Sequence, residues 1–216
     1  MSDLTKTDKT QIRRSPKRGH YDFKTIASIL DEGFICHVGF AVNQQPFVIP
    51  TAYGRLENKV YIHGAGASRM IQSLDAGIEV CLSVTLLDGL VLARSAYHHS
   101  MNYRSVVLFG QAQKVEKPDE KTAALKAFTE HVMKGRWDDV RSPSEAELAG
   151  TTVLSLPIQE ASAKIRTGPP IDDPADYDLS IWAGVLPLNL QAGIPIADPR
   201  LSLGIALPNN ISTYRR

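Results

Sequence analysis

The chain has 216 residues, of which 43% are hydrophobic and 22% charged, with a formal net charge of +1. This length fits one domain, or one domain with a long tail, and the balanced charge gives no sign of a nucleic-acid partner. No apolar run reaches the roughly 20 residues of a membrane span, and no signal-peptide pattern opens the sequence, so we expect a cytoplasmic protein without a membrane partner. Cys36 and Cys81 lie in apolar runs and are expected to be free thiols. The histidines show no ligand-pair spacing, so no metal site is expected.

Residues 1–19 are polar, carry a basic cluster and lack apolar periodicity, which predicts a flexible N-terminal arm. Ile26, Ile29 and Leu30 then predict a helix over residues 22–31 that stops at Gly33. A strand over 34–42, a turn at 43–46 and a return strand over 47–53 follow. Pro50 cannot donate to a ladder, so the return strand is expected at a sheet edge or bulged there.

A strand over 60–63 leads through a small-residue loop into a helix with Ser68 as its N-cap and Gly77 as its stop. Next, residues 78–87 and 90–94 read as strands joined by a hairpin turn at Asp88–Gly89, and residues 105–115 as a further strand.

The C-terminal half begins with a predicted helix over 119–132. A capping box from Ser142 to Glu145 predicts a shorter second helix. One long strand is expected over 151–166, with Pro157 as its irregularity, followed by a loop and an apolar segment at 179–188. Hairpin-linked strands with few helices predict a mostly β, α+β domain over 20–188, an antiparallel sheet curled into a barrel, and a tail over 189–216.

Two stretches carry candidate chemistry. The loop-to-helix junction at 64–69 leaves backbone N–H groups free beside Ser68 and Arg69, which suits an anion such as a phosphate; the alternative is a simple helix cap. Tyr103, Arg104 and Ser105 open the next stretch and can stack on or hydrogen-bond a ligand. Alternatively, Arg104 is an ion-pair partner and Tyr103 an aromatic at the edge of the core.

Four sequence blocks carry a family resemblance: residues 48–53, 61–69, 102–106 and 181–185. In these four blocks and in their order, the chain resembles the FMN-binding split-barrel superfamily of pyridoxamine 5′-phosphate oxidase-like proteins. The similarity points to its flavin-nucleotide-binding branch with the nitroimidazole-resistance (5-nitroimidazole reductase-type) proteins. The resemblance implies an antiparallel split β-barrel that forms a homodimer, with FMN bound between the two subunits.

The resemblance also implies roles for individual residues. The flavin ring would lie along the backbone of one strand: Ile49, Pro50, Thr51, Ala52 and Tyr53. His63 and Gly64 would border the ribityl chain or the ring, and Ser68 and Arg69 would hold the phosphate at the helix start. Ser105, with Tyr103 or Arg104, would reach the flavin or its phosphate from a neighbouring strand, and Trp182 would contact the flavin of the partner subunit. His63 is the candidate proton donor, with a purely structural histidine as the alternative. For Trp182 a place in the core or dimer interface is equally open. The tail carries no basic segment matching the substrate site of the vitamin-processing oxidase, so pyridoxamine phosphate oxidation is not assigned.

The resulting hypothesis is an FMN-dependent oxidoreductase that passes electrons from a nicotinamide donor to a small acceptor such as a nitro compound. A non-catalytic flavin- or haem-binding carrier or sensor is the alternative from another class. A ligand-free split-barrel dimer is a third, and the deazaflavin F420 is a further cofactor option.

Overall fold

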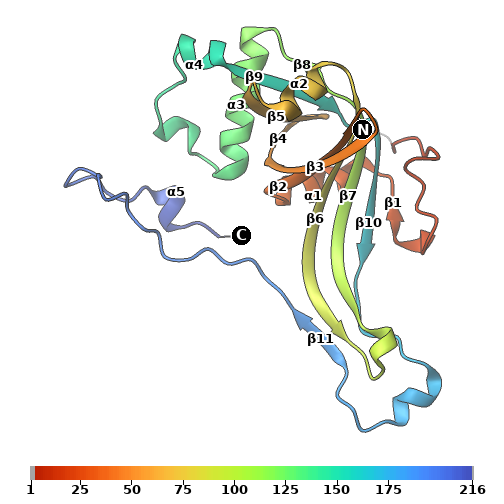
Figure 1. The fold of residues 1–216 in the computed structure, drawn as a ribbon. Helices are drawn as coiled ribbons and strands as arrows, with labels where there is room; N and C mark the ends of the chain where they lie inside the picture. Colours follow the sequence, from red (N-terminus) through yellow and green to blue (C-terminus); the bar gives the residue numbers. More distant parts are fainter. Residues whose placement is uncertain (1–2, 216) are drawn as a thin grey trace.

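The computed structural model describes residues 3–215, which form two antiparallel sheets with helices around them (Figure 1). The strands are β1 (Gly19–His20), β2 (Ile35–Val42), β3 (Gln45–Ala52), β4 (Gly54–Leu56), β5 (Lys59–Ala65), β6 (Glu79–Leu92), β7 (Ser100–Gln111), β8 (Gln113–Lys114), β9 (Thr151–Pro157), β10 (Glu160–Arg166) and β11 (Gly184–Pro187). The helices are α1 (Phe23–Glu32), α2 (Arg69–Asp75), α3 (Pro118–Val132), α4 (Glu145–Gly150) and α5 (Asn209–Ser212).

The larger sheet has the order β1-β10-β7-β6-β2-β3, with β11 also paired to β6, and the smaller sheet has the order β4-β5-β9-β8. The chain crosses from one sheet to the other between β3 and β4, between β5 and β6, between β7 and β8, and between β9 and β10. These crossings join the two sheets into a split barrel, which confirms the expected fold class.

The barrel core lies on one face of the larger sheet. A row of side chains runs across four paired strands on this face: Val38, Leu82, Leu108 and Ala161. Helix α1 packs on the same face through Ile26, Ile29 and Leu30, as its sequence spacing predicts, and the Asp22 side chain caps it by accepting from the Thr25 N–H at 2.8 Å.

The other face of this sheet stays exposed in the single chain. Because side chains alternate along a strand, each core residue has neighbours that point outward. We call the outward side chains of β2, β3 and β6 the open sheet face: Ile35, His37, Val48, Thr85 and Leu87. Three of these five are large aliphatic residues.

The hairpin predicted at Asp88–Gly89 is wrong. Strand β6 runs through both residues with a bulge between Leu87 and Gly89, and the chain reverses instead around the 3₁₀ turn Ala96–His98. Gly89 has no positive φ and pairs with Pro187 of β11. The Asp88 carboxylate accepts hydrogen bonds from Arg104. Tertiary pairing therefore overrides the turn preference of the Asp-Gly pair.

The single strand predicted over residues 151–166 is also wrong. It is divided into β9 and β10, which belong to different sheets, and Pro157 ends β9 because proline cannot donate to a ladder. The capping box lies two residues later than predicted. The Ser144 hydroxyl accepts from the Glu147 N–H, while the Glu147 carboxylate accepts from the Ser144 N–H and from Arg141. The Ser144–Glu147 pair has this additional ion pair with Arg141, whereas the predicted Ser142–Glu145 pair does not.

The N-terminal segment lies along β10 in the described chain. The Thr7 hydroxyl donates to Glu160 at 2.6 Å, the Leu4 N–H donates to the Tyr21 carbonyl at 2.9 Å, and Thr10 is buried. The flexibility of residues 1–19 stays a prediction. Within residues 3–215, the helices are too short or too polar to cross a bilayer.

Candidate functional site

The junction between β5 and α2 has the predicted form. Ser68 is the N-cap residue, Met70, Ile71 and Leu74 are buried, and Gly77 follows the helix with a φ of +79°. The Ser68 side chain makes no capping hydrogen bond. Its hydroxyl is therefore available to a ligand.

Arg69 begins α2 on the surface. No carboxylate lies within ion-pair distance of its guanidinium in the described part of the chain, and its one aromatic contact is the Phe47 ring of β3, 5.1 Å from the guanidinium carbon. An exposed arginine with its N–H groups unengaged suits a phosphate oxygen pair. The Phe47 contact also brings the edge strand β3 beside the helix start.

Strand β3 is an edge strand, as Pro50 predicts, because among residues 3–215 it pairs with β2 alone. Its outer backbone groups are consequently open to a ligand. Tyr53, just beyond the strand, is fully buried and its hydroxyl donates to the Leu30 carbonyl at 2.5 Å. The Tyr53 side chain therefore anchors α1, and only its backbone remains for a cofactor.

His63 lies near the end of β5, half-buried, with its ring edge-on to Phe128 at 4.4 Å between centroids. Neither ring nitrogen makes a hydrogen bond within the described chain. Burial lowers the pKa of His63 below its ordinary value of 6.5. The neutral imidazole is then the main form at neutral pH, which favours a role as acceptor or metal ligand over one as proton donor.

Arg104 is tied to two carboxylates. Its Nε and Nη2 donate to Asp88 at 3.0 and 2.7 Å, and its two Nη atoms donate to Glu32 at the end of α1, the Nη2 bond being 2.7 Å. These partners raise the pKa of Arg104 above its ordinary value. The ion-pair alternative is thus observed in the structure, whereas a flavin contact of Arg104 stays a prediction.

The remaining predicted residues lie further from β3. Ser105 donates its hydroxyl to the Lys164 carbonyl, and β7, which carries it and Tyr103, is separated from β3 by β6 and β2. Three strand spacings amount to roughly 14 Å. Trp182 precedes β11, is 69% exposed and lies against Gly184. One chain alone therefore does not bring all the predicted residues together.

A cavity of about 580 Å³ does join two of them, Pro50 and Arg104. His37 and Thr85 of the open sheet face line it too, and residues 188–190 of the tail close one side. Sequence reasoning did not select His37. The signal was present, because His37 alternates with the buried residues Cys36 and Val38 in a strand pattern.

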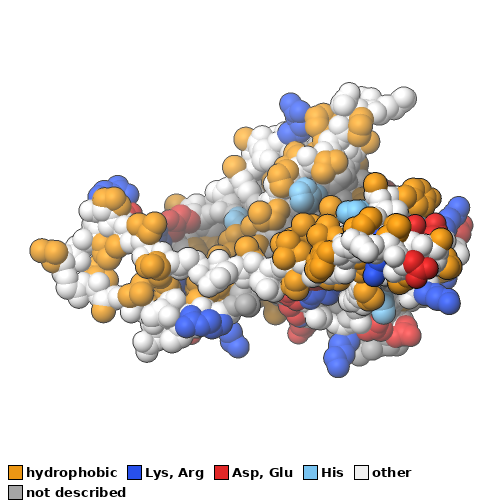
Figure 2. Space-filling model, turned by 90° about the horizontal axis from the view of Figure 1, so that it is seen from below, with side chains coloured by type: hydrophobic (Ala, Val, Ile, Leu, Met, Phe, Trp, Pro, Cys, Tyr) orange, Lys and Arg blue, Asp and Glu red, His pale blue; other side chains and the backbone are white. Residues whose placement is uncertain are grey.

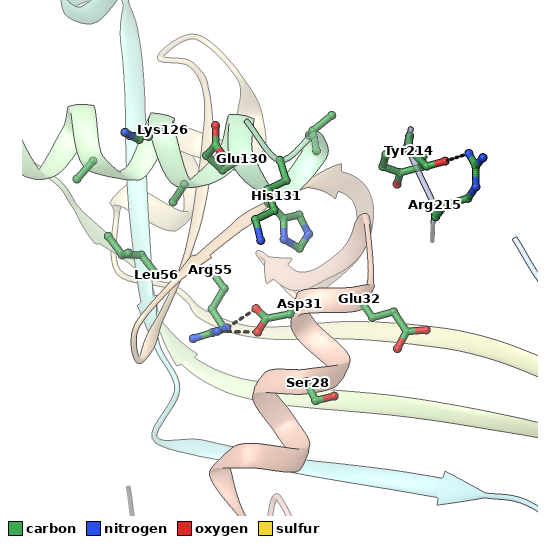
Figure 3. Close-up of a pocket in the computed structure, with 14 residues that line it drawn as sticks. Ser28, Asp31, Glu32, Arg55, Leu56, Lys126, Glu130, His131, Tyr214 and Arg215 are labelled. Carbon is green, nitrogen blue, oxygen red and sulfur yellow. Dashed lines mark hydrogen bonds and ion pairs between the residues drawn. The ribbon is translucent and has the colours of Figure 1, made fainter. Parts of the chain in front are cut away.

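A second cavity, of about 1,040 Å³, contains none of the predicted residues. It lies between α1, α3 and the C-terminus and holds mixed charges, including the two-bond Arg55–Asp31 pair (Figure 3). A third cavity of about 550 Å³ has a mostly apolar lining that includes Phe34, Met133 and residues 190–193 of the tail. Its volume is typical of ligand pockets, which span about 300–1,000 Å³.

Comparison with known proteins gives a consistent result. The structure superposes on a flavocytochrome, Anf3, from Azotobacter vinelandii with a TM-score of 0.90 and 41% identity, covering 97% of each chain. An FAD- and haem-binding protein from Mycobacterium smegmatis gives 0.87 and 32% identity over 90% of this chain and 96% of that one. A Bacteroides thetaiotaomicron protein described as a 5-nitroimidazole antibiotic resistance protein superposes with a TM-score of 0.58 and 25% identity. The match covers 68% of this chain and 86% of that one.

No curated protein sequence matches the chain. The family model described as pyridoxamine 5′-phosphate oxidase matches residues 22–165, two thirds of the sequence, and ends before the tail. The chain belongs to the pyridoxamine 5′-phosphate oxidase family.

Proposed function

We propose that this protein binds a flavin nucleotide, with the phosphate held by Ser68 and Arg69. The observation that carries the proposal is the Arg69 guanidinium, which lacks a carboxylate partner in the described chain and stands beside an unengaged serine hydroxyl and an open strand edge.

A bound flavin supplies the redox chemistry, and the chain supplies position and electrostatics. Arg69 neutralises phosphate charge, and the outer backbone groups of β3 hydrogen-bond the ring edge. Tyr103, Ser105 and Trp182 complete the site from a second copy, since they lie away from β3 in their own chain.

Arg69→Ala tests the phosphate assignment. We expect FMN affinity to fall at least tenfold and riboflavin affinity to change less than twofold, because riboflavin has no phosphate. Arg141→Ala, at an exposed arginine outside β3, β5 and α2, is the control and should alter neither affinity. Equal losses for both ligands would exclude the phosphate role. Identifying the chromophore released from the purified protein distinguishes FMN, as the sequence predicts, from FAD.

We further propose that the protein carries haem, whose iron His63 would bind. Two similar structures are a flavocytochrome and an FAD- and haem-binding protein. His63 fits this role because its imidazole is neutral at neutral pH and unbonded in the described chain. His131, by contrast, is bonded to the Gly33 carbonyl at 2.6 Å.

An absorbance spectrum tests this second proposal. A Soret band should accompany the flavin bands in protein supplied with haemin, and His63→Ala should remove or shift it. His37→Ala replaces another exposed histidine, one that makes no side-chain hydrogen bond within residues 3–215, and should leave the band unchanged. Loss of the band in His37→Ala alone would reassign the ligand, and no band in any sample would exclude haem.

We propose, finally, that the loaded protein is an oxidoreductase that takes electrons from a nicotinamide donor and passes them to a small acceptor. Steady oxidation of NADH or NADPH in the presence of a nitroaromatic compound or oxygen is the expected result. A fully loaded protein that oxidises neither nucleotide would instead support a carrier or sensor.

A further inference from the structure

The tail contains an apolar loop whose large side chains are not buried against the rest of the chain. Within residues 194–207, which we call the tail loop, Ile194 is 91% and Ile196 95% exposed, and Leu203 is fully exposed. Leu201, Ile205 and Leu207 are also exposed. Six large aliphatic side chains in water over 14 residues are costly, because each would gain roughly 1.5–3 kcal/mol on full burial.

The tail loop is tethered at both ends. Before it, β11 pairs with β6 and the Leu188 N–H donates to the Asp88 carbonyl at 3.1 Å; after it, Asn210 of α5 donates to Asp139 at 2.8 Å. Between these anchors the chain projects from the body (Figure 1), and orange side chains are scattered along that projecting lobe in Figure 2. The loop is therefore held in a position where its aliphatic side chains have no cover.

The surface area of the whole chain is too large for a closed monomer. Its accessible surface is 13,713 Å², whereas a folded monomer of 23.7 kDa exposes about 9,800 Å². The excess of about 3,900 Å² is several times the roughly 800 Å² that each partner buries in a standard interface. Burial against a partner would remove this excess.

The charges of the tail loop favour an uncharged protein surface over an anionic partner. Asp198 and Arg200 are its only charged residues, and they lie 3.6 Å apart as an ion pair. The open sheet face is such a surface, because Ile35, Val48 and Leu87 are all about half exposed or more. Each copy of the chain has both a tail loop and an open sheet face. In a dimer with a two-fold axis, the tail loop of each copy can therefore cover the open sheet face of the other.

We propose that the tail loop is an exchanged arm that packs on the open sheet face of a second copy of this chain, and that the reciprocal exchange holds a dimer together. The arm lies outside the family match at residues 22–165. The proposal does not depend on the cofactor, because the association state can be measured with or without flavin.

Leu203→Lys tests the arm by sedimentation velocity across a dilution series. Leu203 is fully exposed, so the change cannot unfold the single chain, and we expect the dimer dissociation constant to rise at least 100-fold. Val140→Lys adds the same charge at an exposed aliphatic residue outside the tail and should leave the constant within threefold of the wild type. A wild type that is monomeric at micromolar concentration, or equal constants for wild type and Leu203→Lys, would overturn the proposal.

A photo-crosslinking amino acid at position 203 locates the contact. Adducts between two chains that map to residues 35–50 or 83–87 are the expected result. Adducts confined to one chain, or inter-chain adducts elsewhere, would overturn the assignment to the open sheet face.

Discussion

Replacing Arg104 with methionine should lower stability, because this side chain joins α1 to the long β6–β7 ribbon. The change keeps an unbranched stem and removes the charge, leaving the Glu32 and Asp88 carboxylates without their shared cation. The side chains of Arg104, Asp88 and Glu32 are 27%, 29% and 43% exposed, so water compensates part of the loss. Between the 0–1 kcal/mol of a surface pair and the 3–5 kcal/mol of a broken buried pair, we expect about 2 kcal/mol.

Thermal melting followed by circular dichroism measures this effect. For a chain of this length, about 2 kcal/mol corresponds to a fall in Tm of about 4–8 °C. Arg141→Met is the matched control, since Arg141 makes the same kind of two-bond contact with Glu147 but is largely exposed, and its Tm should fall much less than that of Arg104→Met. An unchanged Tm in Arg104→Met, or equal falls in both variants, would refute the reasoning.

Three further substitutions or titrations follow from the structure. Tyr53→Phe should cost about 1–3 kcal/mol in urea unfolding, because the buried Leu30 carbonyl loses its donor. Gly54→Ala should cost about 1–3 kcal/mol in the same assay, since a Cβ would lie 2.7 Å from the Phe128 backbone nitrogen; no loss would show that α3 can shift freely. The ion pair with Arg141 and the capping box lower the pKa of Glu147 to about 2. Their contribution to the stability of α4 is therefore fully present above the ordinary pKa of 4.5 and is lost as the pH falls toward 2. Carboxyl NMR titration should show this, and an ordinary pKa would contradict the pair.

The elements that were predicted well are those specified by local pattern. Helix α2 is predicted by the stripe of Met70, Ile71 and Leu74 and by the N-cap at Ser68. Pro50 correctly predicts that β3 lies at an edge. These features need no knowledge of distant residues. The same holds for α1, whose cap and apolar spacing both lie within its own sequence.

The failures share one physical cause, which is pairing between segments distant in sequence. The turn preference of Asp88–Gly89 gave way to β11, nearly 100 residues later, and to Arg104. The division of residues 151–166 between two sheets depends on which strands are already present as neighbours. The role of Arg104 was open in the sequence, because the positions of its two carboxylates follow only from the fold.

The arrangement of the predicted cofactor residues has a thermodynamic consequence. Arg69 and β3 lie at one edge of the larger sheet, whereas Ser105 and Trp182 lie two or more strands away. If a flavin contacts the first group in one copy and the second group in another, it binds the dimer more tightly than the monomer. Linkage then requires that flavin tighten the dimer by the same factor. The dissociation constant of the dimer should therefore fall when FMN or FAD is added. If it does not change at saturating flavin, the whole site lies within one chain.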